Sequence, residues 1–245
     1  MHRFANPAQF LRIAIWLTPL LLVSGALITL AALAWGLFYA PADQLQGDSV
    51  RILYIHVPAA WLGMAGWMAI AAASLAEIVW RHPLAGVAAR AAALPGAFYT
   101  ALCLASGSLW GRPAWGAWWV WDGRLTSMLV MLFLYFGYIA LADAADKQGQ
   151  TSGGSRLVAI FGLIGAVNIP IIHYSVLWWN SLHQVPSISL GKSAMAGAFL
   201  WPLMIATLGF SLLFGGIICA RMRMILANNA AESRLRRMAY AEDAV

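Results

Sequence analysis

Charged side chains are scarce in this chain of 245 residues. Asp, Glu, Lys and Arg together make up 10% of it, whereas apolar residues make up 62%. Soluble globular proteins contain about 25% charged and about 45–50% apolar residues. The mean hydropathy of +0.75 is correspondingly high. The composition therefore excludes an ordinary soluble fold and predicts a polytopic membrane protein.

Cysteine is nearly absent as well. Cys103 and Cys219 each lie inside a long apolar run, so the chain offers no CxxC pair, zinc spacing or disulfide framework. It also lacks the motif G-x-x-x-x-G-K-S/T, which excludes ATP hydrolysis by a P-loop in this chain alone. No internal repeat supports a transporter built from two homologous halves.

Six windows free of Asp, Glu, Lys and Arg are long enough, or nearly so, to cross a membrane. A transmembrane helix needs about 20 apolar residues for a hydrocarbon core of about 30 Å. The windows are 13–42, 52–76, 91–111, 125–142, 157–191 and 193–220. They are continuously apolar, whereas the strands of a membrane barrel alternate. We therefore expect an all-α integral membrane protein with six transmembrane helices and both termini on one side.

The positions of Lys and Arg predict the orientation. Eleven flank the windows on the side of the termini, namely Arg3, Arg12, Arg81, Arg90, Lys147, Arg156, Arg221, Arg223, Arg234, Arg236 and Arg237. Four lie on the other side, namely Arg51, Arg112, Arg124 and Lys192. Because the more positive side stays in the cytoplasm, we expect cytoplasmic N- and C-termini.

This orientation divides the chain into a six-helix membrane domain, residues 1–223, and a polar cytoplasmic tail, residues 224–245, expected to be a solvated helix. The outer face then carries residues 39–51, 110–124 and 178–193. The formal charge of +6 reflects the Lys and Arg residues that orient the chain in the membrane, so we expect no nucleic-acid partner.

The segment 110–124 is unusually rich in tryptophan. It holds five of the thirteen tryptophans, namely Trp110, Trp115, Trp118, Trp119 and Trp121. Tryptophan is typical of membrane interfaces, and anchoring accounts for two or three of them. Four residues argue against a continuous helix here, namely Gly111, Pro113, Gly116 and Gly123. We therefore expect a non-helical aromatic shelf, lying next to lipid, that suits a large, flat, apolar ligand.

Three charged residues accompany this shelf. Asp122 stands just before the apolar run from Leu125, where a carboxylate can cap a helix, and a direct role in ligand binding is the alternative. Arg112 and Arg124 need anionic partners at this depth. Asp122 can supply one, and so can the carboxylate of a ligand, whose geometry matches the guanidinium fork.

Two histidines are predicted to lie on the same face as the shelf. His56 is near the outer end of the second window, where Pro58 suits a first helical turn. His183 follows the pair Trp178 and Trp179. Histidines at a membrane surface often serve only as hydrogen-bonding interfacial residues. The alternative is ligation of haem iron, because neutral imidazole is a common axial ligand.

His173 competes with His183 for that role. It lies inside the fifth window, after Pro170, which is expected to kink or open the helix. The simpler interpretation is a buried histidine bonded to a carbonyl that this proline frees. His2 and His82 fall on the cytoplasmic side and are excluded from the outer site.

At these residues the chain resembles the WWD-domain family of cytochrome c maturation membrane proteins, and within it the short six-span CcmC branch. Tracts 54–60, 110–125 and 178–184 carry the resemblance, which extends over about residues 49–223. The larger relatives CcmF and CcsA have additional spans or domains. Relatives often have an acidic residue before the tryptophan pair, where this chain has Leu177.

The resemblance implies a haem-handling protein of the bacterial inner membrane. Haem b would be held non-covalently and transiently on the periplasmic face, between His56 and His183, with its edge against the tryptophans. It would be presented to the periplasmic chaperone CcmE. The resemblance also implies association with the ABC-type subunits CcmA and CcmB and with CcmD.

We therefore expect a haem-binding protein that is not an enzyme, with Arg51, Arg112 or Arg124 near the haem propionates. Iron–nitrogen bonds are about 2 Å long, so the two ligand nitrogens must approach within about 4 Å and the loop of His183 must fold over the second span. A membrane b-type cytochrome is one alternative, although its histidines usually span the bundle depth. A haem transporter subunit is another, although only Glu77 offers an ionisable group inside a span.

Overall fold

The computed structural model describes residues 6–147, 155–179, 181–183, 188–189 and 192–242. Within them the α-helices are α1 (Pro7–Ala34), α2 (Leu53–Trp80), α3 (Ala85–Trp115), α4 (Gly123–Lys147), α5 (Arg156–Gly165), α6 (Asn168–Trp178) and α7 (Gly197–Glu242). A π-helix, η2 (Trp35–Tyr39), continues α1, and a 3-10 helix, η3 (Asp48–Ile52), precedes α2. Two short strands, β1 (Ile188–Ser189) and β2 (Lys192–Ser193), pair antiparallel with Ile188 opposite Ser193.

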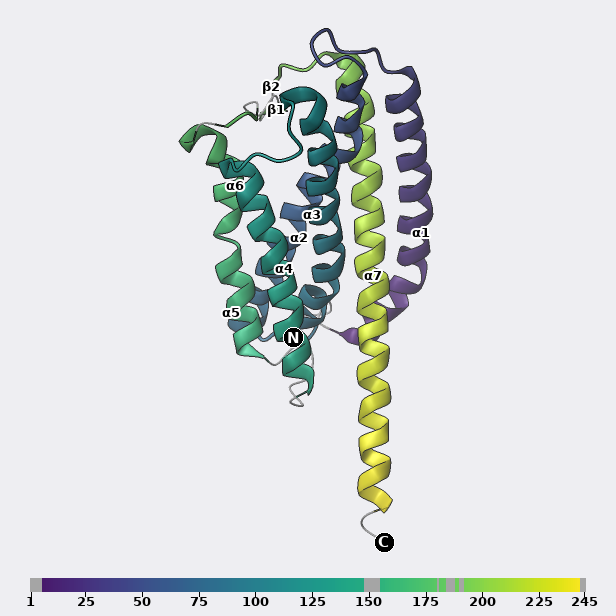
Figure 1. The fold of residues 1–245 in the computed structure, drawn as a ribbon. Coiled ribbons are helices and arrows are strands. Elements are labelled where there is room, and N and C mark those ends of the chain that lie inside the picture. Colours follow the sequence, from purple (N-terminus) through teal and green to yellow (C-terminus); the bar gives the residue numbers. More distant parts are fainter. Residues whose placement is uncertain (1–5, 148–154, 180, 184–187, 190–191, 243–245) are drawn as a thin grey trace.

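The helices form an elongated bundle with two different ends (Figure 1). One end holds the start of α1 and the last turns of α7, and we call it the terminal end. The other holds the α3–α4 connection, β1 and β2, and we call it the tryptophan end. Six helical stretches of the described chain are long and apolar enough to cross a membrane, namely Pro7–Tyr39, Asp48–Trp80, Ala85–Trp115, Gly123–Lys147, Arg156–Trp178 and Gly197–Ala239. The predicted all-α, six-span fold is confirmed.

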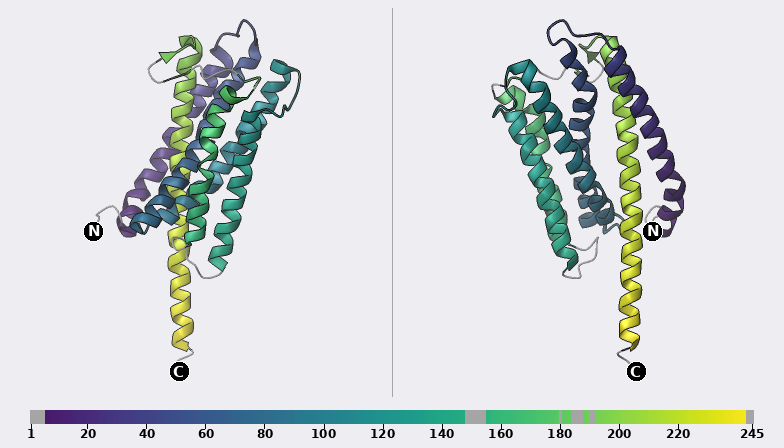
Figure 2. Two further views of the ribbon diagram at one scale, coloured as in Figure 1. Left: turned by 90° about the vertical axis from the view of Figure 1, so that its left-hand side faces the viewer. Right: turned by 45° about the vertical axis from the view of Figure 1, so that its right-hand side comes forward.

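Several helices extend beyond the uncharged windows. Helix α3 begins at Ala85 and so includes Arg90, and α7 continues past Ala220 to Glu242 as one helix that projects from the bundle (Figure 2). The end of an uncharged window shows only where the first charged residue stands. The helix itself continues as long as its backbone hydrogen bonds are formed. Long arginine side chains can also bury their apolar stems while the guanidinium group stays in contact with water.

The fifth span differs most from its window. It ends at Trp178 and is interrupted between α5 and α6. Pro170 lies in the first turn of α6 and has no N–H to donate to the carbonyl of Ala166, so one α-helical hydrogen bond is missing where α5 and α6 meet. The predicted interruption at this proline is confirmed.

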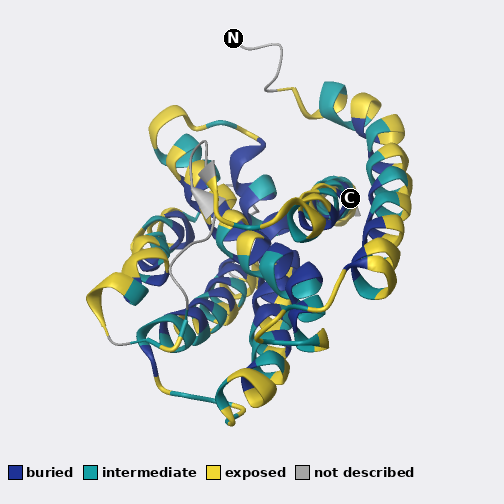
Figure 3. Cartoon of the chain, turned by 90° about the horizontal axis from the view of Figure 1, so that it is seen from above, coloured by how far each residue is buried: buried dark blue, intermediate teal, exposed yellow. Residues whose placement is uncertain are grey.

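Small residues bring α1 and α7 together. Seen along the bundle, α7 lies between α1 and the other helices (Figure 3). A Cβ on Gly209 would lie 2.6 Å from the backbone nitrogen of Thr29, and a Cβ on Gly25 would lie 2.6 Å from that of Leu213. Such close backbone approach is how membrane helices associate, because lipid tails provide no hydrophobic driving force between them.

Trp67 anchors the core between α2, α4 and α5. It is fully buried, donates its indole N–H to the carbonyl of Gly162 at 3.1 Å, and packs edge-on against Tyr135. Tyr135 in turn donates its hydroxyl to the carbonyl of Gly63 at 2.7 Å. A Cβ on Gly165 would lie only 2.1 Å from the Trp67 ring. Glycine is therefore required where α5 crosses this side chain.

Replacing Gly165 with alanine is expected to lower stability by about 1–3 kcal/mol, because overpacking forces the indole off its position. The measurement is the melting temperature of the detergent-solubilised protein. Gly215→Ala is the matched control, since a Cβ there would meet only Leu21 Cδ1, at 3.7 Å. Equal melting temperatures for the two variants would show that the Trp67 packing is not tight.

Candidate functional site

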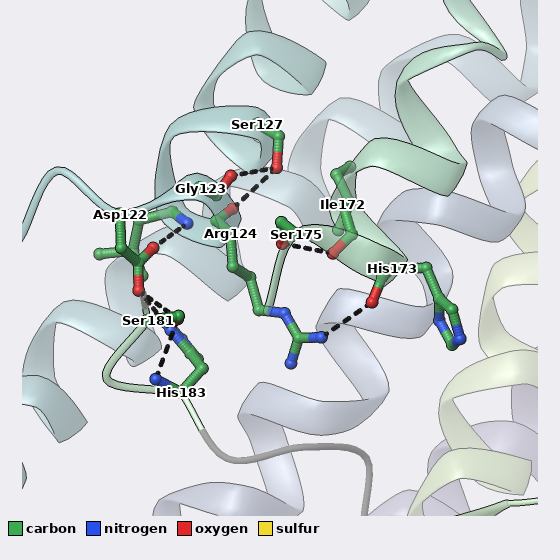
Figure 4. A network of polar contacts seen from close by, with 10 residues as sticks. Asp122, Gly123, Arg124, Ser127, Ile172, His173, Ser175, Ser181 and His183 are labelled. Atoms are coloured by element: carbon green, nitrogen blue, oxygen red, sulfur yellow. Dashed lines mark hydrogen bonds and ion pairs between the residues drawn. The ribbon is translucent and has the colours of Figure 1, made fainter. Parts of the chain in front are cut away.

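Asp122 lies at the centre of the tryptophan end and uses its two carboxylate oxygens differently. Oδ1 accepts the backbone N–H of Leu125 at 2.8 Å and so caps α4. Oδ2 accepts the Ser181 hydroxyl at 2.7 Å and His183 Nδ1 at 2.9 Å (Figure 4). Burial alone would raise the pKa of Asp122, but these hydrogen bonds outweigh it and hold the pKa below its usual value. The two predicted roles, cap and site residue, are thus compatible.

His183 is fastened to this carboxylate from the segment that follows α6. Its backbone N–H donates to the hydroxyl of Ser181 at 3.1 Å, and its ring meets Trp115 edge-on, with centroids 4.8 Å apart. Burial lowers the pKa of His183, and Asp122 offsets this only in part, so the imidazole is neutral at pH 7. The ionised carboxylate can only accept. The ring proton therefore lies on Nδ1, and Nε2 keeps its lone pair.

The imidazole of His56 also carries its proton on Nδ1, but it belongs to a different element of the fold. It lies in the first turns of α2, and its Nδ1 lies 3.0 Å from the carbonyl oxygen of Cys103 and 3.2 Å from Ser106 Oγ. A carbonyl cannot donate, so Nδ1 carries the proton and Nε2 is again the unprotonated nitrogen. The ring packs on Gly107, where a Cβ would lie 2.8 Å from it, and meets Trp110 edge-on at 5.7 Å.

The five tryptophans differ in their contacts with the histidines and in their exposure. Trp110 and Trp115 contact them, and Trp110 also donates its indole N–H to Gln46 Oε1 at 2.8 Å. Trp119 packs edge-on against Trp121, and its indole nitrogen is buried without a hydrogen-bond partner. Trp118 and Trp121 are exposed. The segment therefore combines an inner aromatic wall with an outer surface suited to lipid.

The expectation of a non-helical shelf over 110–124 is only partly right. Helix α3 continues to Trp115, and only residues 116–122 are non-helical before α4 begins. Pro113 has no N–H to donate to the carbonyl of Leu109, so α3 lacks one hydrogen bond in its last turn and continues for only two more residues. Gly116, at φ 76°, then ends the helix in the left-handed conformation, which glycine adopts without strain.

Arg124 is the arginine that lies with the histidines. It donates to the backbone carbonyl of His173 at 3.3 Å and is within electrostatic range of Asp122, His56 and His183. Its Nε is buried and has no hydrogen-bond partner. An unpaired buried donor is costly, so this guanidinium is suited to an anionic ligand group.

Arg51 and Arg112 lie at helix ends. Arg51 donates to the carbonyls of Leu37 and Ala40 at 2.5 and 3.2 Å, which closes the end of η2, and it forms an ion pair with Asp48 at 3.2 Å. Its Nε, like that of Arg124, is buried without a hydrogen-bond partner. Arg112 donates to the carbonyl of Gly116 at 2.5 Å at the end of α3. Their guanidinium groups serve helix ends, as cations near helix C-termini commonly do.

The side chains of His173 and His82 take no part in this arrangement. The His173 side chain is exposed, so the expectation that it is buried is wrong, and it points away from Asp122 and His183 (Figure 4). His82 lies in the connection between α2 and α3, and His2 lies outside the described residues.

The tract that carries the tryptophan pair is described in part. Leu177, Trp178 and Trp179 are all exposed. Asn180 and Gln184 lie outside the described residues.

Four residues of the site were not singled out for it from sequence. Ser106 and the carbonyl of Cys103 hold His56, Gly107 makes room for its ring, and Ser181 supports the His183 segment. Only Ser181 had a usable signal, because a serine two residues before a histidine can accept its backbone N–H. The other three depend on how α2 packs on α3.

Known proteins of one family match this chain over nearly its whole length. A family model described as Heme exporter protein C matches residues 1–237. The heme exporter protein C of Bradyrhizobium diazoefficiens is 47% identical over 223 residues, which cover 89% of this chain and 82% of that protein. That of Escherichia coli strain K12 is 42% identical over 226 residues, covering 92% and 90%. That of Haemophilus influenzae is 41% identical over 235 residues, covering 95% and 94%. The chain belongs to the heme exporter protein C family.

Proposed function

We propose that this protein binds haem b at its tryptophan end, with His56 and His183 as axial ligands of the iron, and delivers it for cytochrome c maturation. The observation that carries the proposal is the matched state of the two imidazoles. Each Nδ1 is held by an acceptor, so each Nε2 is available as a ligand. Metal-binding histidines are typically oriented in this way by a carbonyl or carboxylate.

The residues around the histidines fit a porphyrin. In the described part of the chain, no group of three or more His, Cys, Asp or Glu side chains could hold a metal ion. Two axial histidines suffice for haem, because the macrocycle supplies the other ligands. Trp110 and Trp115 provide an apolar wall, and the unpaired donors of Arg124 and Trp119 suit the propionate carboxylates.

The membrane side follows from the positive residues. By sequence, eleven of the fifteen Lys and Arg residues belong to the side of the termini, which supports a cytoplasmic location for that side in a bacterial inner membrane. The haem is then on the periplasmic face, where CcmE would receive it. CcmA, CcmB and CcmD are the proposed membrane partners. The protein binds and releases haem non-covalently and breaks no bonds, so we propose no enzymatic activity.

The attachment of His183 supports transient binding. Its segment is fastened to the helices through Asp122, by two hydrogen bonds. Release of this one carboxylate frees the ligand, as a carrier requires and a permanent electron-transfer site does not. This observation favours delivery over a b-type cytochrome.

Transfer of haem to the chaperone tests the function. Purified protein loaded with haem in detergent is mixed with the soluble periplasmic domain of CcmE, and haem on each protein is followed by gel staining and absorbance. Haem is expected to move to CcmE from the wild type. Stable binding with no transfer, together with reversible redox cycling by a quinol, would support the cytochrome alternative instead. Haem accumulation inside vesicles that contain this chain alone would support the transporter.

A further inference from the structure

A cavity lies toward the terminal end, away from the histidines. It has a volume of about 380 Å³ and lies between α3, α4 and α7. Helix α3 packs against both neighbours and lies between them in Figure 1. The charged residues of its lining are Arg90, Asp143, Asp146, Arg221 and Glu232. None of them belongs to the site described above.

The charged lining lies at the level where the apolar spans end. Arg90 directly precedes the uncharged window 91–111, and Arg221 directly follows the window 193–220. The window 125–142 ends at the residue before Asp143. Three helices thus change from apolar to charged around one cavity, which places its lining at the level of lipid head groups.

An exposed apolar face of α3 continues from this cavity. Its residues recur at helical spacing, namely Leu94, Phe98, Ala101, Ala105 and Leu109. Tyr99 packs against Phe210 of α7 on one side of this face, and Gly96 packs against Tyr135 of α4 on the other. Leu94 also lines the cavity, so the apolar face and the charged lining are continuous.

The charges of the lining are unevenly paired. The side chain of Arg90 is only 15% exposed and forms ion pairs with Asp143 at 3.2 Å and with Asp146. Arg221 donates Nε to the carbonyl of Ala91 at 3.1 Å, and its guanidinium has no ion pair within the described residues. The guanidinium of Arg221 can therefore still pair with a phosphate. Asp143 and Asp146 share the single guanidinium of Arg90, whereas Glu232 pairs at 3.7 Å with Arg236, which lies outside the lining.

We propose that this cavity binds phosphatidylethanolamine. The phosphate would pair with Arg221, the primary ammonium with the carboxylates of Asp143 and Asp146, and one acyl chain would lie along the exposed face of α3. Because these two carboxylates share the one positive charge of Arg90, they favour an ammonium and disfavour phosphatidylglycerol and other anionic lipids. Phosphatidylcholine lacks ammonium hydrogens and cannot donate to the carboxylates.

Native mass spectrometry with defined lipids tests this site. The full-length protein is supplied in detergent with equal amounts of phosphatidylethanolamine, phosphatidylglycerol and phosphatidylcholine. We expect the ethanolamine lipid to be retained preferentially. Arg221→Ala is expected to reduce its retention about fivefold, the effect of roughly one interfacial cationic contact. Arg223→Ala is the matched control, because Arg223 lies on the same helix outside the lining and should leave retention unchanged.

Several outcomes would overturn the proposal. Equal retention of the three lipids would show that the cavity does not select the ethanolamine head group, and preference for phosphatidylglycerol would show that the carboxylates do not govern selection. Retention of soluble glycerophosphoethanolamine as strongly as the lipid would remove the role of the exposed face of α3. If Arg221→Ala does not fold, Arg221→Gln and the wild-type lipid competition decide the question.

Discussion

Replacing His183 with alanine is expected to lower haem affinity more than about 100-fold, and His56→Ala is expected to do the same. Loss of the outer-shell partner of a metal-bound histidine already costs about 10–100-fold, so loss of the ligand itself should cost more. Each variant leaves the iron with one imidazole. The measurement is a haem titration of the detergent-solubilised protein, followed by Soret absorbance and pyridine-haemochrome content.

His173→Ala is the matched control for this experiment. His173 comes from the same region of the chain, but its side chain is exposed and points away from Asp122 (Figure 4). Its replacement should leave affinity within about twofold, as for a surface position. Unchanged haem binding in both His56→Ala and His183→Ala would mean that the tryptophan segment binds another ligand.

Asp122→Asn is expected to lower haem affinity by about 10–100-fold, although the side chain keeps its size. An amide has only one oxygen. If that oxygen continues to cap α4 through Leu125, the amide NH₂ faces Nδ1 of His183, which must then accept a hydrogen bond. The ring proton moves to Nε2, and the nitrogen required by the iron is no longer available. The same titration measures this effect, with melting temperature recorded beside it.

Asp43→Asn separates this effect from a general loss of a carboxylate. Asp43 also lies at the tryptophan end and accepts the backbone N–H groups of Leu45 and Gln46, both at 2.9 Å, through a single oxygen. It contacts no histidine among the described residues. Wild-type affinity in Asp122→Asn, with the protein folded, would show that the carboxylate does not set the tautomer of His183.

The six-span fold could be predicted because uncharged runs of this length have few stable forms outside a membrane. The helix ends could not, because they depend on pairing between distant charges. Arg90 lies inside α3 since Asp143 and Asp146 neutralise it from α4. The continuation of α3 to Trp115 was missed because Pro113 removes one hydrogen bond to the preceding turn without ending the helix at once.

The polar residues of the candidate site could be predicted from the sequence, but the groups that hold them in place could not. His56, His183 and Asp122 stand out because polar groups are few in this sequence. The carbonyl that holds His56 lies 47 positions away and becomes available only through helix packing. The three outer arginines are equivalent in sequence. Only the structure shows that Arg51 and Arg112 bind helix-terminal carbonyls while Arg124 lies with the histidines.

The coordination of the iron tests the central claim most directly. The electron paramagnetic resonance spectrum of the ferric haem complex distinguishes two imidazole ligands from one. The wild type should give a low-spin signal typical of two axial histidines, and His56→Ala and His183→Ala should each convert it to a high-spin signal. A high-spin wild type, or a low-spin signal that survives either replacement, would contradict the bis-histidine site.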